Sequence, residues 1–134
     1  MNYRSILDEK NVRPSIIRMK VIEFLDKNRI HPTVDEIYEG LCDDIPTLSK
    51  TSVYNTVKLL RDKGIILELT IEENRARYDF CTKTHGHLLC DCCKKVYDVP
   101  VTRIENPNLD GYKVRETDVY YLGVCKECLS YNNN

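Results

Sequence analysis

The chain has 134 residues, a formal net charge of −1, and 42% hydrophobic against 31% charged residues. This length allows one ordinary domain or two very small ones, and the composition is typical of a soluble globular protein. A membrane span and a globally basic surface are excluded, since the sequence has no long apolar run and no excess of positive charge. The first residues lack the apolar core of a signal peptide, so we expect a cytoplasmic protein with reduced cysteines.

The N-terminal half is predicted to contain short helices with tight connections. Apolar residues in Ser15–Lys27 recur with the spacing of a helix that has a broad buried face. Thr33 and Glu36 have the spacing of a capping box at the start of a second helix. Ser49 is suited to cap a third helix, which would end at Gly64. Helices in this succession predict a helix-turn-helix.

Two segments rich in β-branched or aromatic residues, Ile65–Ile71 and Arg75–Phe80, follow and predict a β-hairpin. Helices followed by a hairpin describe a winged helix, which in a cytosolic protein is most often a DNA-binding module, although a fold does not fix a function. The segment Thr47–Lys63 is locally basic, which agrees with DNA binding. A solvated helix face explains the same charge equally well.

In the C-terminal half, from Cys81 onward, the sequence pattern changes and predicts strands. His87–Cys90, Lys95–Val99 and Tyr112–Leu122 are predicted strands, with glycine and proline marking the turns between them. We therefore expect a domain boundary near residues 80–84.

Two Cys-x-x-Cys pairs lie in this half, Cys90 with Cys93 and Cys125 with Cys128. Four thiolates in this arrangement are the ligands that a structural zinc ion needs for closed tetrahedral coordination. Cys92 lies beside the first pair and could replace a ligand, but the spacing favours Cys93. The sequence therefore predicts a structural zinc site.

A second group of metal-binding side chains surrounds the first cysteine pair. His85 and His87 are two apart, so in a strand both imidazoles point to the same side. A histidine pair of this kind is often incidental, but Asp79 and Asp98 on flanking strands strengthen the prediction of a site. His31, from the other half of the chain, would let one ion set the angle between the halves. Nitrogen and carboxylate donors suit Fe(II), Mn(II), Co(II) or Zn(II) without selecting among them.

Short motifs along nearly the whole chain carry a family resemblance. They are His31-Pro32-Thr33, Thr51–Val57, Arg77–Phe80, His85-Gly86-His87, Cys90/Cys93, Val96-Tyr97-Asp98 and Gly123-Val124-Cys125. With these motifs the chain resembles the ferric uptake regulator (Fur) superfamily, and within it the peroxide-sensing PerR branch.

The resemblance implies an α+β protein that acts as a homodimeric, metal-dependent transcriptional repressor and not as an enzyme. Residues 1–80 would form a winged helix-turn-helix domain that binds double-stranded operator DNA. Residues 81–84 would form a hinge, and residues 85–134 a small α/β dimerisation domain with the structural zinc. The expected partners are operator DNA and a second copy of the chain, with no membrane and no small-molecule substrate other than peroxide.

The resemblance also implies a regulatory Fe(II) or Mn(II) ion bound by His31, Asp79, His85, His87 and Asp98. Iron-uptake regulators usually have a glutamate at one of the two carboxylate positions, whereas both are aspartate here, as in the peroxide-sensing branch. Iron-catalysed oxidation of His31 or His85 would then weaken the site and release DNA.

The third helix supplies candidate DNA contacts. Lys50 and Lys58 suit phosphates, whereas Ser52, Tyr54 and Asn55 can approach base edges. An asparagine prefers adenine in the major groove. Tyr54 is equally well explained as a half-buried helix residue.

The chain departs from the family pattern in three places. Arg13 and Arg18, which the resemblance assigns to phosphate contacts, flank a motif whose proline has moved. Thr117 stands where the family commonly has a histidine. The segment Pro100–Asp110 resembles a shortened version of a dimerisation-domain helix.

Three other functions are compatible with parts of the sequence. A regulator of iron, zinc or manganese homeostasis would use the metal as a reversible corepressor, and the ligand types do not exclude it. A metalloenzyme is disfavoured because no nucleophile or general acid/base accompanies the site. A zinc-stabilised adaptor would leave the histidines and aspartates unexplained.

Overall fold

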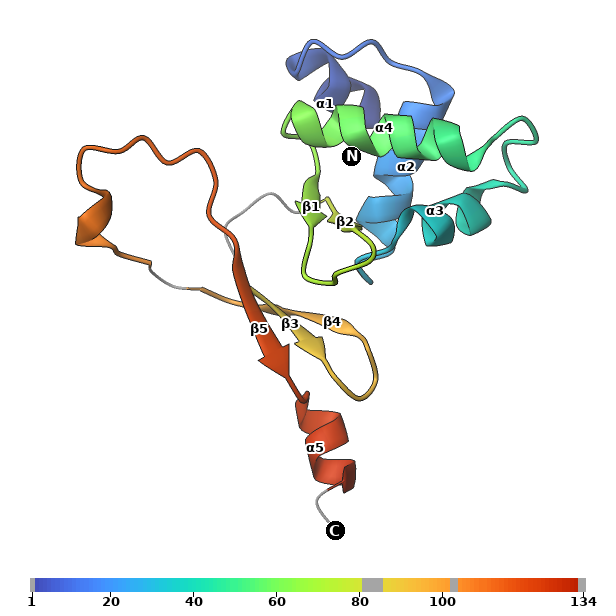
Figure 1. The fold of residues 1–134 in the computed structure, drawn as a ribbon. Coiled ribbons are helices and arrows are strands. Elements are labelled where there is room, and N and C mark those ends of the chain that lie inside the picture. The colour runs from blue at the N-terminus through green and yellow to red at the C-terminus, as the bar shows by residue number, and fades with distance from the viewer. Residues whose placement is uncertain (1, 81–85, 102–103, 133–134) are drawn as a thin grey trace. The chain divides into compact units, whose positions relative to one another are not determined.

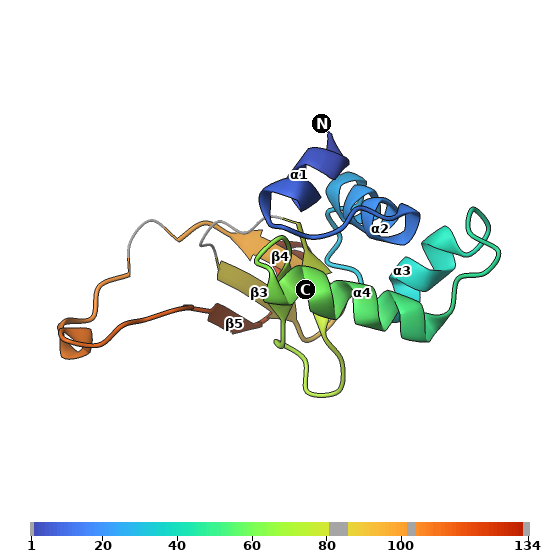
Figure 2. The same ribbon diagram turned by 90° about the horizontal axis from the view of Figure 1, so that it is seen from above.

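The computed structural model describes residues 2–80, 86–101 and 104–132 (Figures 1 and 2). The chain divides into two compact units, Met1–Thr82 and Lys83–Asn134. The predicted α+β class is confirmed, because the first unit combines helices with a two-stranded sheet and the second combines a three-stranded sheet with a helix. The predicted hinge 81–84 lies outside the described residues. Within the described ranges, no helix has the length and apolar character that a membrane span requires.

The first unit consists of helices followed by a pair of short strands. Its elements are α1 (Tyr3–Glu9), α2 (Ile16–Lys27), α3 (Val34–Leu41), α4 (Lys50–Asp62), β1 (Leu67–Leu69) and β2 (Arg77–Asp79).

The helix starts follow from local side-chain chemistry. The Ser15 hydroxyl accepts a hydrogen bond from the Arg18 backbone at the start of α2. Thr33 and Glu36 form the predicted capping box at α3, and Ser49 caps α4. Helix α1 was not predicted, because its seven residues are too few for a clear apolar periodicity.

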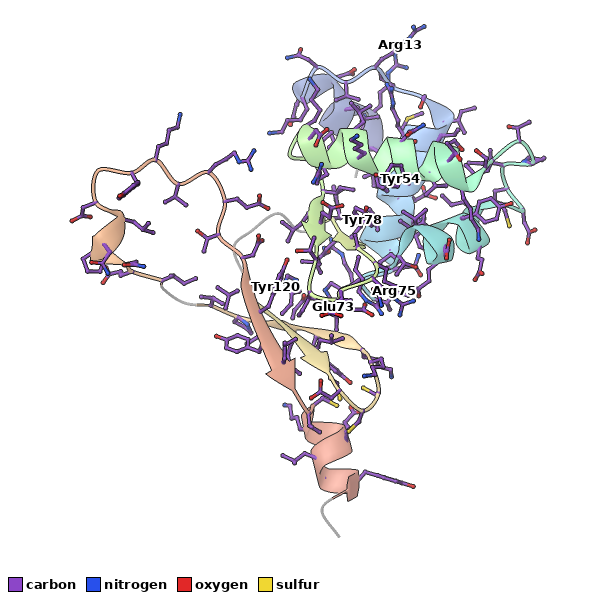
Figure 3. All side chains as sticks on the ribbon, in the orientation of Figure 1. Arg13, Tyr54, Glu73, Arg75, Tyr78 and Tyr120 are labelled. Atoms are coloured by element: carbon purple, nitrogen blue, oxygen red, sulfur yellow. The ribbon has the colours of Figure 1, made fainter. Side chains whose placement is uncertain are left out.

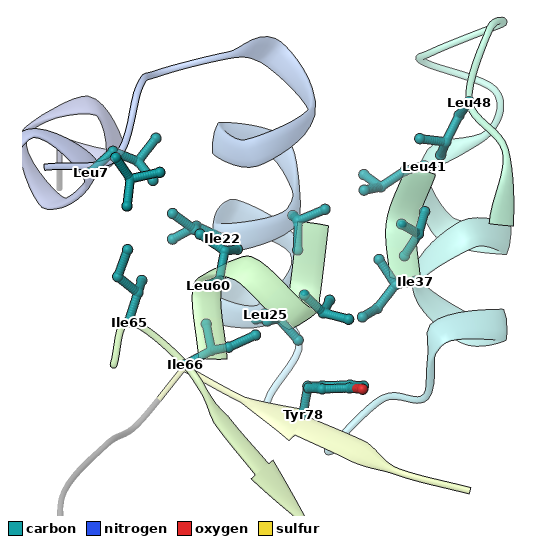
Figure 4. Packing of buried hydrophobic residues seen from close by; sticks show 14 of the residues in the cluster. Leu7, Ile22, Leu25, Ile37, Leu41, Leu48, Leu60, Ile65, Ile66 and Tyr78 are labelled. Carbon is teal, nitrogen blue, oxygen red and sulfur yellow. The ribbon is translucent and has the colours of Figure 1, made fainter. Parts of the chain in front are cut away.

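The core of this unit lies between its helices (Figure 4). Ile22 and Leu25 of α2, Ile37 of α3 and Leu60 of α4 are almost completely buried. Each such side chain contributes about 1.5–3 kcal/mol through burial. The helix-turn-helix is therefore held by a shared apolar interior.

The strands of the hairpin are shorter than predicted. The backbone amides of Ile65 and Ile66 donate to the Leu60 carbonyl, so these residues terminate α4 and do not begin the strand. Strand β1 pairs antiparallel with β2, with Glu68 opposite Tyr78.

A polar link connects the hairpin to α4. Glu68 accepts hydrogen bonds from Tyr78 Oη at 3.1 Å and from Arg61 Nη1 at 2.6 Å. Burial, with the Glu68 carboxylate adjacent, raises the pKa of Tyr78, so its hydroxyl stays protonated and continues to donate. The wing and α4 are joined through a single carboxylate.

The second unit is built on the central strand β3. Its elements are β3 (Gly86–Cys90), β4 (Val96–Val99), the 3-10 turn η1 (Pro107–Leu109), β5 (Val119–Gly123) and α5 (Lys126–Asn132). Strand β3 pairs antiparallel with β4 and parallel with β5. Helix α5 was not predicted from the sequence.

The structure corrects the prediction of a strand over Tyr112–Leu122. Only its last residues, from Val119, are in β5, and the preceding Tyr112 and Val114 are 73% and 50% exposed. Residues with high strand propensity form no strand unless a neighbouring strand pairs with them and covers one face. In the segment Pro100–Asp110, which resembled a shortened helix, the described residues contain only η1.

Candidate metal centres

The two cysteine pairs lie at the same end of the sheet in the second unit. Cys90 ends β3, and its partner across the parallel pairing is Gly123, two residues before Cys125. Cys93 lies in the turn after β3, and Cys128 lies in the first turn of α5. The sulfur atoms of Cys90, Cys93, Cys125 and Cys128 all lie within 4.8 Å of one another.

This cluster has the dimensions of a tetrahedral zinc site. The Sγ atoms of Cys93 and Cys125 are 3.9 Å apart. A tetrahedron with Zn–S bonds of about 2.3 Å requires a sulfur–sulfur distance of about 3.8 Å. A disulfide requires about 2.05 Å, and none of the four cysteines is in one. The four sulfurs therefore fit a zinc ion.

Hydrogen bonds within the cluster shift the pKa values of its cysteine thiols. The backbone amides of Cys125 and Cys93 donate to the Cys90 sulfur at 3.4 and 3.5 Å, which lowers the pKa of Cys90 to about 6. A hydrogen bond with Tyr97 lowers the pKa of Cys125. A hydrogen bond with Cys125 contributes most to raising the pKa of Cys128, to about 12. The lowered pKa values of Cys90 and Cys125 favour thiolates, which are the form that binds a divalent ion.

Cys92 is exposed and is not among the four clustered cysteines. With Cys93, Glu127, Cys128 and Tyr131 it lines a shallow cavity of about 320 Å³. The structure therefore brings Cys93, and not Cys92, into the sulfur cluster, as the Cys-x-x-Cys spacing favours.

The first unit contains one histidine–aspartate pair. His31 Nε2 lies 3.7 Å from Asp79 Oδ2, and both side chains are buried. His31 has a left-handed backbone, with φ of 58°, directly before Pro32, a conformation that needs support from its surroundings. The Tyr78 amide donates to the Pro32 carbonyl at 2.9 Å, and Arg77 donates to the His31 carbonyl at 3.0 Å. These bonds fix the His31 loop on β2.

The second unit contains another histidine–aspartate pair. His87 of β3 and Asp98 of β4 are direct cross-strand partners, and His87 Nε2 lies 3.3 Å from Asp98 Oδ1. The Tyr120 ring of β5 lies 6.5 Å from the His87 ring. His87 is buried, whereas Asp98 is about half exposed. His85, the remaining predicted ligand, lies outside the described residues.

Sequence reasoning missed three residues that support these groups. They are Arg29, Arg77 and Tyr97, which contact Asp79, the His31 carbonyl and the cysteine cluster, respectively. No local motif marks them, because each acts on a partner that only the fold brings close. Arg77 and Tyr97 lie inside motifs of the family resemblance, which was the only available signal.

The model of the ferric uptake regulator family matches residues 9–121. The chain belongs to this family. It is a metal-responsive regulator and not an enzyme.

Relatives of this Fur-family chain come from several branches. The "Peroxide-responsive repressor PerR" of Staphylococcus aureus (strain USA300) is 33% identical over 127 residues, which cover 91% of this chain and 86% of the relative. A Streptococcus pyogenes PerR structure, described as showing the basis for peroxide sensing and gene regulation, has 30% identity and a TM-score of 0.54, with coverage of 92% and 88%. The Helicobacter pylori ferric uptake regulator Fur, described as having three functional metal-binding sites, has a TM-score of 0.71 at 21% identity, with coverage of 96% and 94%. The last likeness concerns the fold alone.

The DNA-contact candidates of this Fur-family protein lie mainly on α4. Lys50, Tyr54, Asn55 and Lys58 are exposed. Tyr54 is 53% exposed, which agrees both with a DNA contact and with a half-buried helix residue (Figure 3). Ser52 has a structural role as well, because its hydroxyl accepts from the Ser49 amide and donates to the Ser49 carbonyl.

The other two candidates lie on and beside the loop between α1 and α2. Arg13 is on this loop (Figure 3). Arg18 is in the first turn of α2. Arg18 Nη1 donates to the Arg13 carbonyl at 2.7 Å. The two predicted phosphate contacts are therefore neighbours in the structure.

Proposed function

We propose that this protein is a homodimeric, cytoplasmic repressor that binds operator DNA when a divalent ion is bound, and that it senses hydrogen peroxide. The observation that carries the proposal is the presence of one histidine–aspartate pair in each of its two compact units. Both acidic members are aspartates, as the PerR resemblance implies. The 33% identity to a peroxide-responsive repressor supports the same branch.

The regulatory ion would need both pairs. Each pair supplies two donors, whereas protein-bound divalent transition metals take at least four ligands. We assign His31 and Asp79 from the first unit, and His87, Asp98 and His85 from the second. An ion held in this way connects the DNA-binding unit to the other unit, so metal occupancy would control DNA affinity. The nitrogen and oxygen donors suit Fe(II) or Mn(II).

The cysteine cluster would have a separate, structural role. Among the residues that the structure describes, all members of the large apolar core come from the first unit. A unit as small as residues 83–134 buries too little surface to be stable without help. A zinc ion on Cys90, Cys93, Cys125 and Cys128 would supply this stability.

Peroxide sensing requires a histidine that changes permanently. A bound Fe(II) ion would supply the redox chemistry for cleaving peroxide, as a catalyst that is not consumed in the net reaction. In the net reaction an imidazole carbon of His31 or His85 gains one oxygen atom from peroxide, and the second oxygen leaves as water. The oxidised ring is a poorer donor, so the connection between the units weakens and DNA is released.

DNA recognition is assigned to α4. Lys50 and Lys58 would bind phosphates, together with Arg13 and Arg18, and Asn55 would read a base edge. Ser52 and Tyr54 lie on the same helix and complete the proposed contact set.

Peptide mass spectrometry tests the proposal. The full-length protein is loaded anaerobically with Fe(II), given a low dose of hydrogen peroxide and compared with a Mn(II)-loaded sample. We expect one added oxygen on the peptide containing His31 or His85, in the iron sample only. Equal oxidation of both samples would contradict the mechanism.

A regulator of metal homeostasis is the second candidate, because the fold is shared with the Helicobacter pylori Fur. In that case the iron sample would show no oxidation, and metal-dependent DNA binding would be fully reversible.

A further inference from the structure

The two oxygens of the Asp79 carboxylate have different neighbours. Oδ2 lies 3.7 Å from His31 Nε2, whereas Oδ1 lies 3.6 Å from Arg29 Nη1. Asp79 is only 4% exposed, so this side chain has little freedom to turn. One oxygen faces a proposed metal ligand, and the other faces a fixed cation.

Arg29 is itself held in place from two sides. Its Nη2 lies 3.1 Å from Asp26 Oδ1, and its Nε donates to the Asp26 carbonyl at 3.2 Å. Its guanidinium also lies over the Phe80 ring, 5.6 Å from the ring centre. These hydrogen bonds and the aromatic contact hold the Arg29 guanidinium in one position beside Asp79, in contrast to a mobile surface charge. All of these residues belong to the first unit, so this geometry does not depend on the second.

We propose that Arg29 is a positioning residue that keeps Asp79 a one-oxygen ligand of the regulatory ion. The inference rests on the proposed regulatory site. Carboxylates bind divalent ions through one oxygen or through both. Because the guanidinium attracts Oδ1, the ion receives Oδ2 alone. Asp79 then supplies one donor atom to the ion, although a carboxylate can supply two.

The same cation also tunes metal affinity. A positive charge beside a ligand oxygen repels a divalent ion and competes with it for the carboxylate. The Arg29 side chain is 48% exposed, so solvent screens much of this effect. Removing the charge is expected to tighten metal binding roughly three- to tenfold.

Cobalt spectroscopy of the full-length, zinc-loaded protein tests the inference. Co(II) is titrated into wild type, Arg29→Gln and the control Arg75→Gln, an arginine that pairs with Glu72 instead. Wild type and Arg75→Gln should give the same visible Co(II) bands and the same affinity. Arg29→Gln should give weaker visible bands, as expected when the coordination number of Co(II) rises, together with tighter binding, because Asp79 can then use both oxygens.

The outcomes separate this inference from the proposed function. If Arg29→Gln has the wild-type spectrum and affinity, the role of Arg29 is wrong while the metal site stands. If the cobalt bands persist unchanged in Asp79→Asn and in His87→Ala, the ligand set itself is wrong, and the inference fails with it.

Discussion

Arg77 Nη1 donates to the backbone carbonyl of His31 at 3.0 Å, across 46 positions of the chain. The Arg77 side chain is buried and also pairs with Glu72 on the wing. Because the His31 backbone is left-handed, it depends on such a contact. One arginine thus connects the wing to the loop that carries a proposed metal ligand.

Replacing this arginine should damage both stability and metal binding. Arg77→Gln leaves Glu72 without its buried partner and the His31 carbonyl without its donor. We expect a loss of about 2–4 kcal/mol in the free energy of unfolding, measured with urea. The matched variant Arg75→Gln removes an exposed partner of the same glutamate and should cost less than about 1 kcal/mol. Similar losses in the two variants would contradict the role of Arg77.

The Glu72 ion pairs also predict a pH dependence. Burial raises the pKa of Glu72, but hydrogen bonds and charge from Arg77 and Arg75 outweigh it, so the net pKa is lowered. A lowered pKa in the folded state contributes stability above the unfolded pKa of about 4.3, and this stability is lost as pH falls through the folded value. Wild type should therefore be more stable than Glu72→Gln at pH 7. The difference should shrink in unfolding experiments below about pH 4.

Adjacent cysteines should respond differently to the same substitution. Cys93→Ser removes a member of the sulfur cluster, whereas Cys92→Ser changes an exposed neighbour. We expect Cys93→Ser to lose its zinc and the cooperative unfolding of the second unit, and Cys92→Ser to retain both. The checks are the zinc-to-protein ratio by elemental analysis and the thermal unfolding curve. Zinc loss from Cys92→Ser would show that Cys92 takes part in coordination.

Two exposed side chains of α4 should separate base reading from phosphate binding. Asn55→Ala is expected to relax the sequence preference in a selection from a random DNA pool. Lys58→Ala should weaken binding to all selected sequences and make the salt dependence shallower by about one unit of slope. If both variants changed only the sequence preference, the phosphate role of Lys58 would be refuted.

Local signals in the sequence were sufficient for much of the fold. The Thr33–Glu36 capping box and the ends of the main helices depend on residues within a few positions of one another, and the structure confirms them. The strand predicted over Tyr112–Leu122 depended on a partner strand that propensity does not reveal, and most of it was wrong. Helices α1 and α5 were missed because each is only seven residues long.

The candidate site also divides into features that local sequence signals predict and features that depend on long-range contacts. Regular spacing identified the cysteine pairs, and their clustering follows from the parallel pairing of β3 with β5. The contact of Arg29 with Asp79 joins residues that are distant in sequence and carry no common motif. Long-range contacts of single charged side chains follow from the fold and could not be predicted before it.

The parallel pairing of β3 and β5 also has a kinetic consequence. Two parallel neighbours need a long connection, and closing this loop costs entropy before any strand contact forms. A zinc ion captured first by Cys90 and Cys93 could recruit Cys125 and Cys128 and so bring β5 to β3. The refolding rate of the second unit would then rise with the concentration of zinc. The metal would nucleate folding in addition to stabilising the folded state.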